Sequence, residues 1–141
     1  MIYVEEKDFD RQMELLSFLA QTHELNVCAW LYPESTATTI AGNIVIKNSL
    51  NLVPVTTYEN GHLPSLTQFV KANQSSISKY AVAHAELKKN CDSVTLYKEN
   101  DSSWFAATIG HEGMCLVQDD KQITNLISAG FTASLEAPSW W

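Results

Sequence analysis

Apolar side chains recur at helical spacing from residue 5 to residue 22, which predicts an amphipathic helix with one buried face. The residues of this apolar stripe are Phe9, Met13, Leu15, Leu16, Leu19 and Ala20. Carboxylates occupy the opening turn and the outer face of the predicted helix, at Glu5, Glu6, Asp8, Asp10 and Glu14. Those in the opening turn would stabilise the helix, because its amino-terminal end carries partial positive charge.

Three extended segments follow, and each is rich in β-branched or aromatic residues. They cover residues 27–32, 38–47 and 50–58. Pro33 ends the first of them, because proline has no amide hydrogen to donate to a neighbouring strand. Asn60 and Gly61 predict a tight turn after the third segment.

The longest helical pattern covers residues 64–89 and predicts a long second helix. The positions that share one helical phase are Leu66, Phe69, Val70, Asn73, Ile77, Tyr80, Ala81, His84 and Leu87. Residues 73–76 have low helix propensity, so a kink or a division into two shorter helices is the alternative.

The last third of the chain has a strand pattern that is interrupted by one short helix. Strands are predicted over residues 94–99, 104–109, 114–118 and 131–136. Between the last two, Ile123, Leu126 and Ile127 have helical spacing. Asp119 or Asp120 can cap this helix, and Gly130 can end it in the left-handed conformation.

This order of elements predicts an α+β fold in which a curved antiparallel sheet of about six to seven strands has helices packed on one face. A sheet of mixed strand direction is the alternative. The same order is consistent with an αβββ–αβββ pseudo-repeat, followed by a C-terminal short helix and strand. Sequence support for the repeat is short, because residues 31–34 and 96–99 share only the pattern Leu-Tyr-x-Glu.

The length of 141 residues fits one domain, and we expect a single domain over residues 1–141. The apolar runs are far shorter than the ~18 residues of a membrane span, so we expect no membrane partner. The amino terminus lacks the basic start and long apolar stretch of a signal peptide, which favours a cytoplasmic protein. The three cysteines, Cys28, Cys91 and Cys115, lie far apart, and this favours reduced, buried thiols.

The net charge is −7, with 16 acidic residues against nine basic ones, and Arg11 is the single arginine. A negative field repels nucleic acid, and arginine is the side chain that most often reads phosphates and base edges. The composition therefore argues against a nucleic-acid partner. It favours a basic protein partner, which the negative field would attract and steer.

A second group of acids is predicted at one end of the last three central strands. If these strands form an antiparallel meander, the turn at residues 99–103 and the connection at 118–121 lie at the same end. This would gather Glu99, Asp101, Asp119 and Asp120. Such a group could hold a divalent cation or contact lysines of a partner, although aspartates are also ordinary turn and cap residues.

Two histidines have neighbours that could support chemistry. His111 and Glu112 could act as a general base and its orienting group, but no nucleophile is recognisable beside them, and a glycine-flanked turn explains the pair. His84 lies shortly before Cys91, and a Cys–His couple can produce a reactive thiolate, although a buried histidine is commoner. No metal-ligand spacing and no phosphate-binding loop is present, so we expect neither a metal nor a cofactor.

The chain ends in Trp140 and Trp141, and two large aromatic residues at a terminus either close the core or anchor a partner. Together with the acids, this pair predicts a small acidic protein-binding module of the inhibitor, immunity or dedicated chaperone type. The predicted contact residues for its basic partner are Glu5, Glu6, Asp8, Asp10, Glu14, Glu99, Asp101, Asp119, Asp120, Trp140 and Trp141.

Two other functions remain open from the sequence. The first is a small-molecule-binding domain or enzyme, with an apolar pocket between the curved sheet and the long second helix. Asn73 and His84 would orient the ligand there. The second is a homo-oligomer in which the tryptophan pair is buried against another copy of the chain.

Overall fold

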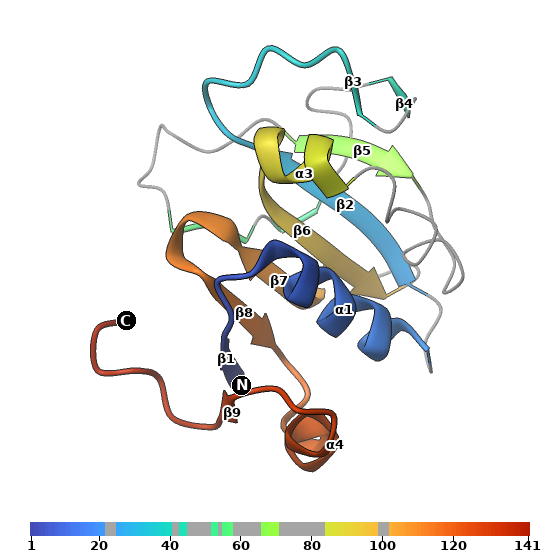
Figure 1. Cartoon of the computed structure of the whole chain (residues 1–141). Coiled ribbons are helices and arrows are strands. Elements are labelled where there is room, and N and C mark those ends of the chain that lie inside the picture. Colours follow the sequence, from blue (N-terminus) through green and yellow to red (C-terminus); the bar gives the residue numbers. More distant parts are fainter. Residues whose placement is uncertain are drawn as a thin grey trace.

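The computed structural model describes residues 1–21, 25–40, 43–44, 52–53, 55–57, 66–70, 84–98 and 102–141. Within these ranges the chain forms a seven-stranded sheet and a separate two-stranded ribbon (Figure 1). In spatial order the strands of the sheet are β5 (Leu66–Val70), β2 (Leu25–Leu31), β6 (Cys91–Lys98), β7 (Trp104–Ile109), β8 (Met114–Val117), β1 (Ile2–Glu5) and β9 (Ala133–Ser134). Every neighbouring pair among them is antiparallel, so the predicted antiparallel sheet is confirmed and the mixed alternative is wrong.

The described residues also form three α-helices and the small ribbon. The helices are α1 (Phe9–Ala20), α3 (His84–Asn90) and α4 (Ile123–Ser128). The ribbon pairs β3 (Thr39–Ile40) with β4 (Asn43–Ile44), and both lie inside the range predicted as one strand, 38–47. The prediction of a single strand there is wrong, because the chain turns back on itself within the range.

The start of the predicted first helix is wrong, because residues 2–5 form strand β1. This strand pairs with β8, where Val4 faces Cys115, and Ile2 and Val4 are fully buried. The helix begins only at Phe9, after Asp8 has taken the cap position. Asp8 Oδ1 accepts a hydrogen bond from the amide of Asp10 at 2.9 Å, which satisfies one of the free donors of the first turn.

Asp8→Ala is expected to lower the free energy of unfolding by about 1 kcal/mol, because the first turn of α1 would lose its side-chain acceptor. Asp8→Asn keeps an acceptor oxygen and should recover most of that loss. Urea unfolding followed by circular dichroism measures both. Equal losses in the two variants would show that the charge of Asp8 matters and that its capping hydrogen bond does not.

The apolar stripe of α1 packs against one face of the sheet and forms the larger core. Leu16 is fully buried, in one cluster with Val4 of β1 and Leu96 of β6. Leu87 of α3 and Leu126 of α4 belong to the same cluster. Because burial of each leucine contributes about 1.5–3 kcal/mol, this layer is the main source of the stability of the fold.

A segment outside any strand covers part of the opposite face of the sheet. Its Val55 is 5% exposed and packs in a second apolar cluster with Met114. Tyr97 Oη donates a hydrogen bond to the carbonyl oxygen of Val53 at 2.7 Å. The prediction of a strand over residues 50–58 is wrong for the described residues in this range, because they pack on the face of the sheet without joining its edge.

The long helix predicted over residues 64–89 is wrong at its start, where residues 66–70 form strand β5. This strand pairs with β2, and Trp30 lies opposite Leu66. A short run of apolar and β-branched residues fits helix and strand periods almost equally well, and pairing along the open edge of β2 decides between them. Only the end of the prediction survives, as α3, and residues 71–83 lie outside the described residues.

The meander β6–β7–β8 was predicted correctly to within three residues at each end, and it forms the centre of the sheet. The short helix α4 is confirmed, and Gly130 after it has a φ of 90°, as its predicted stop requires. The αβββ–αβββ pseudo-repeat is not confirmed, because β1 precedes the first helix and β5 lies where the second helix was predicted to start.

Candidate functional site

Exposed apolar side chains gather where the C-terminal segment meets strand β1. Trp140 and Trp141 are 52% and 41% exposed, and Leu135 and Met1 are 54% and 41% exposed. The two indole rings pack edge to face with their ring centres 6.0 Å apart. Trp141 packs in the same manner on Tyr3, with the ring centres 6.4 Å apart. We call Met1, Tyr3, Leu135, Trp140 and Trp141 the C-terminal apolar surface.

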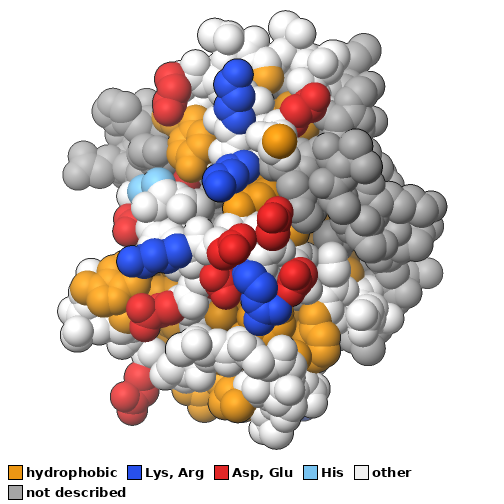
Figure 2. Space-filling model, in the orientation of Figure 1, with side chains coloured by type: hydrophobic (Ala, Val, Ile, Leu, Met, Phe, Trp, Pro, Cys, Tyr) orange, Lys and Arg blue, Asp and Glu red, His pale blue; other side chains and the backbone are white. Residues whose placement is uncertain are grey.

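Pairing of β9 with β1 holds this surface in place. Ser134 lies opposite Tyr3, and the chain continues from there to the C terminus at the left of Figure 1. Phe131, just before β9, is 7% exposed, and the guanidinium of Arg11 lies 4.4 Å from the centre of its ring. In Figure 2 an apolar patch with charged side chains beside it lies where Figure 1 places this segment. The tryptophans therefore follow an anchored segment.

The acids near α1 are engaged in local interactions. Arg11 forms ion pairs with Glu14 and, at 3.8 Å, with Glu6. Glu6 Oε1 also accepts the amide hydrogen of Asp8, which itself caps the helix. Glu5 lies on β1 and not in the helix, and Asp10 lies in the first turn. Figure 2 accordingly shows acidic and basic side chains interleaved over α1, and a partner footprint there stays a prediction.

Of the four acids predicted to gather at the meander end, two lie in the described residues. Asp120 forms an ion pair with the ammonium group of Met1, so it borders the C-terminal apolar surface. Asp119 Oδ1 accepts the amide hydrogen of Lys121 at 3.2 Å and acts as a cap. Glu99 and Asp101 lie outside the described residues, so their convergence with Asp119 stays a prediction.

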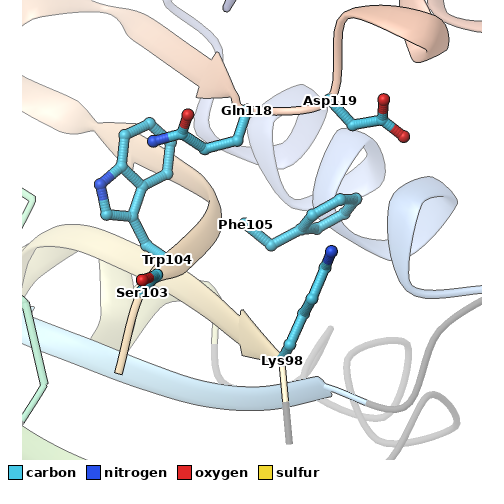
Figure 3. A pocket seen from close by; sticks show the side chains of 6 residues that line it. All are labelled: Lys98, Ser103, Trp104, Phe105, Gln118 and Asp119. Atoms are coloured by element: carbon cyan, nitrogen blue, oxygen red, sulfur yellow. The ribbon is translucent and has the colours of Figure 1, made fainter. Parts of the chain in front are cut away.

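A pocket of about 440 Å³ lies at this same end of the meander (Figure 3). Its lining residues are Lys98, Ser103, Trp104, Phe105, Gln118 and Asp119. Figure 3 shows Lys98 pointing toward Phe105, and its Nζ lies 5.4 Å from the ring centre. The pocket therefore lies where the ends of β6 and β8 meet the start of β7, and Lys98 is one of its lining residues.

The pocket expected for a small ligand depended on the long second helix, and β5 replaces the start of that helix. Asn73 and the side chain of His84 lie outside the described part of the structure, so a ligand contact by either residue stays a prediction. Burial and the charge of Asp92 raise the pKa of the Cys91 thiol to about 12. A raised pKa opposes formation of a reactive thiolate, so the structure gives no support to a His84–Cys91 couple.

Four polar side chains converge where the β7–β8 turn meets the start of β6. His111 Nδ1 lies 2.5 Å from Asp92 Oδ1, and His111 Nε2 lies 2.9 Å from Thr57 Oγ1. Glu112 Oε1 is 3.2 Å from the same Thr57 oxygen and 3.3 Å from His111 Nε2. We call Asp92, His111, Thr57 and Glu112 the His111 cluster. Its two histidine nitrogens have different partners, a carboxylate on one side and a hydroxyl on the other.

Asp92 is the unusual member of the cluster, because its side chain is fully buried. Its Oδ1 also accepts the amide hydrogen of His111 at 3.3 Å, whereas its Oδ2 has no hydrogen-bond partner within the described part of the chain. With a proton on Nδ1, the ring donates to Asp92 and presents Nε2 as an acceptor toward Thr57. A carboxylate that orients a histidine whose other nitrogen meets a hydroxyl is the arrangement that activates nucleophiles.

Two glycines allow the turn to approach β6 this closely. A Cβ on Gly110 would lie 2.9 Å from the carbonyl oxygen of Asp92, which is closer than side chains tolerate. Gly113 has a φ of 66° in the left-handed region, which confirms one of the two positive φ angles expected of these glycines. The turn itself is a short 3₁₀ helix over Gly110–Glu112.

His111 and Glu112 are recognisable in the sequence as a candidate pair, whereas Asp92 and Thr57 were not predicted. Thr57 lies 54 residues before His111 in the chain, and no local pattern joins them. Asp92 had a signal, because aspartate is depleted in strands and here follows Cys91 at the start of a strand-like run. A charged residue inside an apolar strand is a reason to look for a buried partner.

No family model, curated protein or solved structure matches this chain. The described residues contain no group of three or more histidine, cysteine, aspartate or glutamate side chains that could hold a metal ion. A search of the same residues finds no helix with the length and apolar character needed to cross a membrane.

Proposed function

We propose that this protein binds a basic protein partner through the C-terminal apolar surface, as an inhibitor, an immunity protein or a dedicated chaperone does. One observation carries the proposal: Trp140 and Trp141 remain about half exposed although the segment before them is anchored to β1. Tryptophan is enriched among the residues that dominate binding energy at protein interfaces. Because Trp141 is already held against Tyr3 and Trp140 against Trp141, little conformational freedom is lost when a partner covers the rings.

Charge supports the choice of a basic partner. The net charge of −7 would attract such a protein and raise its rate of association. Asp120 borders the surface through its contact with Met1, and Glu136 follows Leu135 directly. Glu14, by contrast, is paired with Arg11 on the outer face of α1. We therefore place the acidic rim of the binding site at Asp120 and Glu136.

Trp140→Ala and Trp141→Ala are each expected to weaken binding of the purified partner by about 2 kcal/mol, while the stability of the free protein changes little. The partner is first retained from native cell extract on the tagged full chain, identified, and prepared alone. Titration calorimetry then compares the two variants with Val53→Ala, which removes an exposed apolar side chain (48% exposed) outside this surface.

Two results would contradict the proposal. The first is wild-type affinity of the purified partner for the double variant Trp140→Ala/Trp141→Ala. The second is a wild-type chain that sediments as a dimer and becomes monomeric in that double variant, which would support the homo-oligomer.

Charge reversal at Asp120 and Glu136 should slow association strongly at low salt and weakly at high salt, because salt screens exposed charges.

A further inference from the structure

We propose that Thr57 is a nucleophile activated by His111, with Asp92 as the positioning residue, and that the His111 cluster performs acyl transfer from carboxylic esters. The activity is separate from partner binding, because none of the four side chains belongs to the C-terminal apolar surface. It requires no metal or cofactor. The attacking atom is Thr57 Oγ1, and the general base is His111 Nε2.

The distances agree with those required of a nucleophile and its base. Such a pair works at a separation of about 2.6–3.2 Å between heavy atoms, and Thr57 Oγ1 lies 2.9 Å from His111 Nε2. The base must in turn be oriented by a third group on its other nitrogen, and Asp92 Oδ1 lies 2.5 Å from Nδ1. The order of the groups is therefore carboxylate, imidazole, hydroxyl. The carboxylate lies at Nδ1 of the ring and the hydroxyl at Nε2.

Solvent exposure increases from Asp92 through His111 to Thr57, so the carboxylate is shielded from water and the hydroxyl is accessible. The Asp92 side chain is fully buried, the His111 side chain is 28% exposed, and Thr57 is exposed. A buried carboxylate interacts strongly with the ring, because little water screens it. An exposed hydroxyl can be reached by an ester from solvent. Asp92 thus stabilises the positive charge that develops on the ring when Thr57 loses its proton.

Glu112 adds a second negative charge beside the ring, and it also affects the resting hydroxyl. Its Oε1 lies 3.2 Å from Thr57 Oγ1 and can accept the hydroxyl hydrogen in place of His111. This contact holds the hydroxyl beside the ring until a substrate arrives. When the proton moves to Nε2, the Glu112 carboxylate at 3.3 Å favours the charged ring.

The covalent step conserves atoms and charge. Thr57 Oγ1 forms a bond to the ester carbonyl carbon, and its proton passes to His111 Nε2. The tetrahedral intermediate then expels the alcohol oxygen, which takes that proton from Nε2; where the leaving group departs as an anion, Nε2 passes the proton to solvent water. Water, deprotonated by the same nitrogen, attacks the acyl-threonine and releases the carboxylic acid with the free hydroxyl of Thr57.

The test uses the full chain and p-nitrophenyl acetate, whose acyl group is transferred without protonation of the leaving group. We expect a burst of one p-nitrophenolate per chain, and an acetyl group that peptide mass spectrometry locates on Thr57. Thr57→Val should abolish the burst, whereas Thr57→Ser, which keeps a hydroxyl, should retain it. Thr56→Val is the matched control and should acylate like the wild type.

The roles of the other two residues have separate readouts. His111→Gln should slow acylation by about 100-fold or more, because no general base remains. Asp92→Asn should lower the acylation rate across the whole pH profile, since an amide can donate to Nδ1 and so leave the proton on Nε2.

Three outcomes would overturn the proposal in a protein whose circular dichroism shows it to be folded. They are the absence of a burst, a burst that persists in Thr57→Val, and acetyl groups found on lysines or the amino terminus but not on Thr57. The double variant Trp140→Ala/Trp141→Ala should acylate at the wild-type rate. Failure of the acylation test therefore leaves partner binding intact, and loss of partner binding leaves the acylation test intact.

Discussion

His111→Ala is expected to lower the free energy of unfolding at neutral pH by about 3 kcal/mol. The Asp92 side chain is fully buried, and the imidazole is the side chain that donates to its Oδ1. Without the ring the carboxylate would keep the amide of residue 111, at 3.3 Å, as its remaining donor among those described. A buried carboxylate with too few donors is costly, because it has lost water without an adequate replacement.

Urea unfolding followed by circular dichroism measures this effect, and two variants control it. Glu112→Ala removes a partly exposed carboxylate of the same cluster and should change stability by less than about 1 kcal/mol. Asp92→Asn in the His111→Ala background should recover part of the loss, because a neutral amide is less costly to bury unpaired than a charge. A wild-type urea midpoint for His111→Ala would show that Asp92 does not depend on the ring.

Leu16→Ala is expected to lower the free energy of unfolding by about 3 kcal/mol, as large-to-small changes in a packed core do. Leu16 is fully buried between α1 and the sheet, in the cluster that also contains Val4 and Leu96. Truncation removes apolar contact and leaves a cavity that neighbouring strands cannot close, because their positions are held by hydrogen bonds on both sides.

Glu14→Ala is the matched control for Leu16→Ala, because it lies on the outer face of the same helix. Its ion pair with Arg11 is exposed to solvent, and such pairs contribute about 0–1 kcal/mol. Thermal unfolding monitored by circular dichroism compares the two variants. If both variants lose the same stability, burial of Leu16 against the sheet would not be the main contribution of α1 to the stability of the fold.

The elements that were predicted correctly are those whose signals are local. Strand β7 was predicted with the observed bounds, because β-branched and aromatic residues are followed by a turn with glycines at Gly110 and Gly113. Helix α4 was predicted from three apolar positions, with Asp119 before it and Gly130 after it. In each case the residues that begin and end the element lie within a few positions of it.

The errors occurred where a distant strand determines the local conformation. Glu5 was predicted as the first residue of a helix but belongs to β1, which pairs with β8, and residues 66–70 fit a helical phase but pair with β2. In both segments the sequence is compatible with either structure. The hydrogen bonds offered by the open edge of a strand exceed the small difference in intrinsic propensity.

The residues of the candidate sites also divide into those with a local sequence signal and those brought together only by the fold. Trp140, Trp141 and Asp120 were named as candidates from composition and position alone, but the exposure of the two indoles could not be predicted in that way, and Glu136 was missed. The pair formed by His111 and Glu112 was visible in the sequence, whereas Asp92 lies 19 residues and Thr57 54 residues away in the chain. No spacing rule connects four residues that come from three separate segments.

The amino-acid sequence by itself determined the local elements with strong turn and cap signals and the acidic charge. These follow from properties of neighbouring residues, and short-range interactions are sufficient to produce them. Only the tertiary structure decided that the amino terminus is a strand, that the C-terminal indoles stay half exposed, and that a buried carboxylate meets His111. Each of these depends on strand pairing between distant segments, which gains its free energy only when the whole sheet assembles.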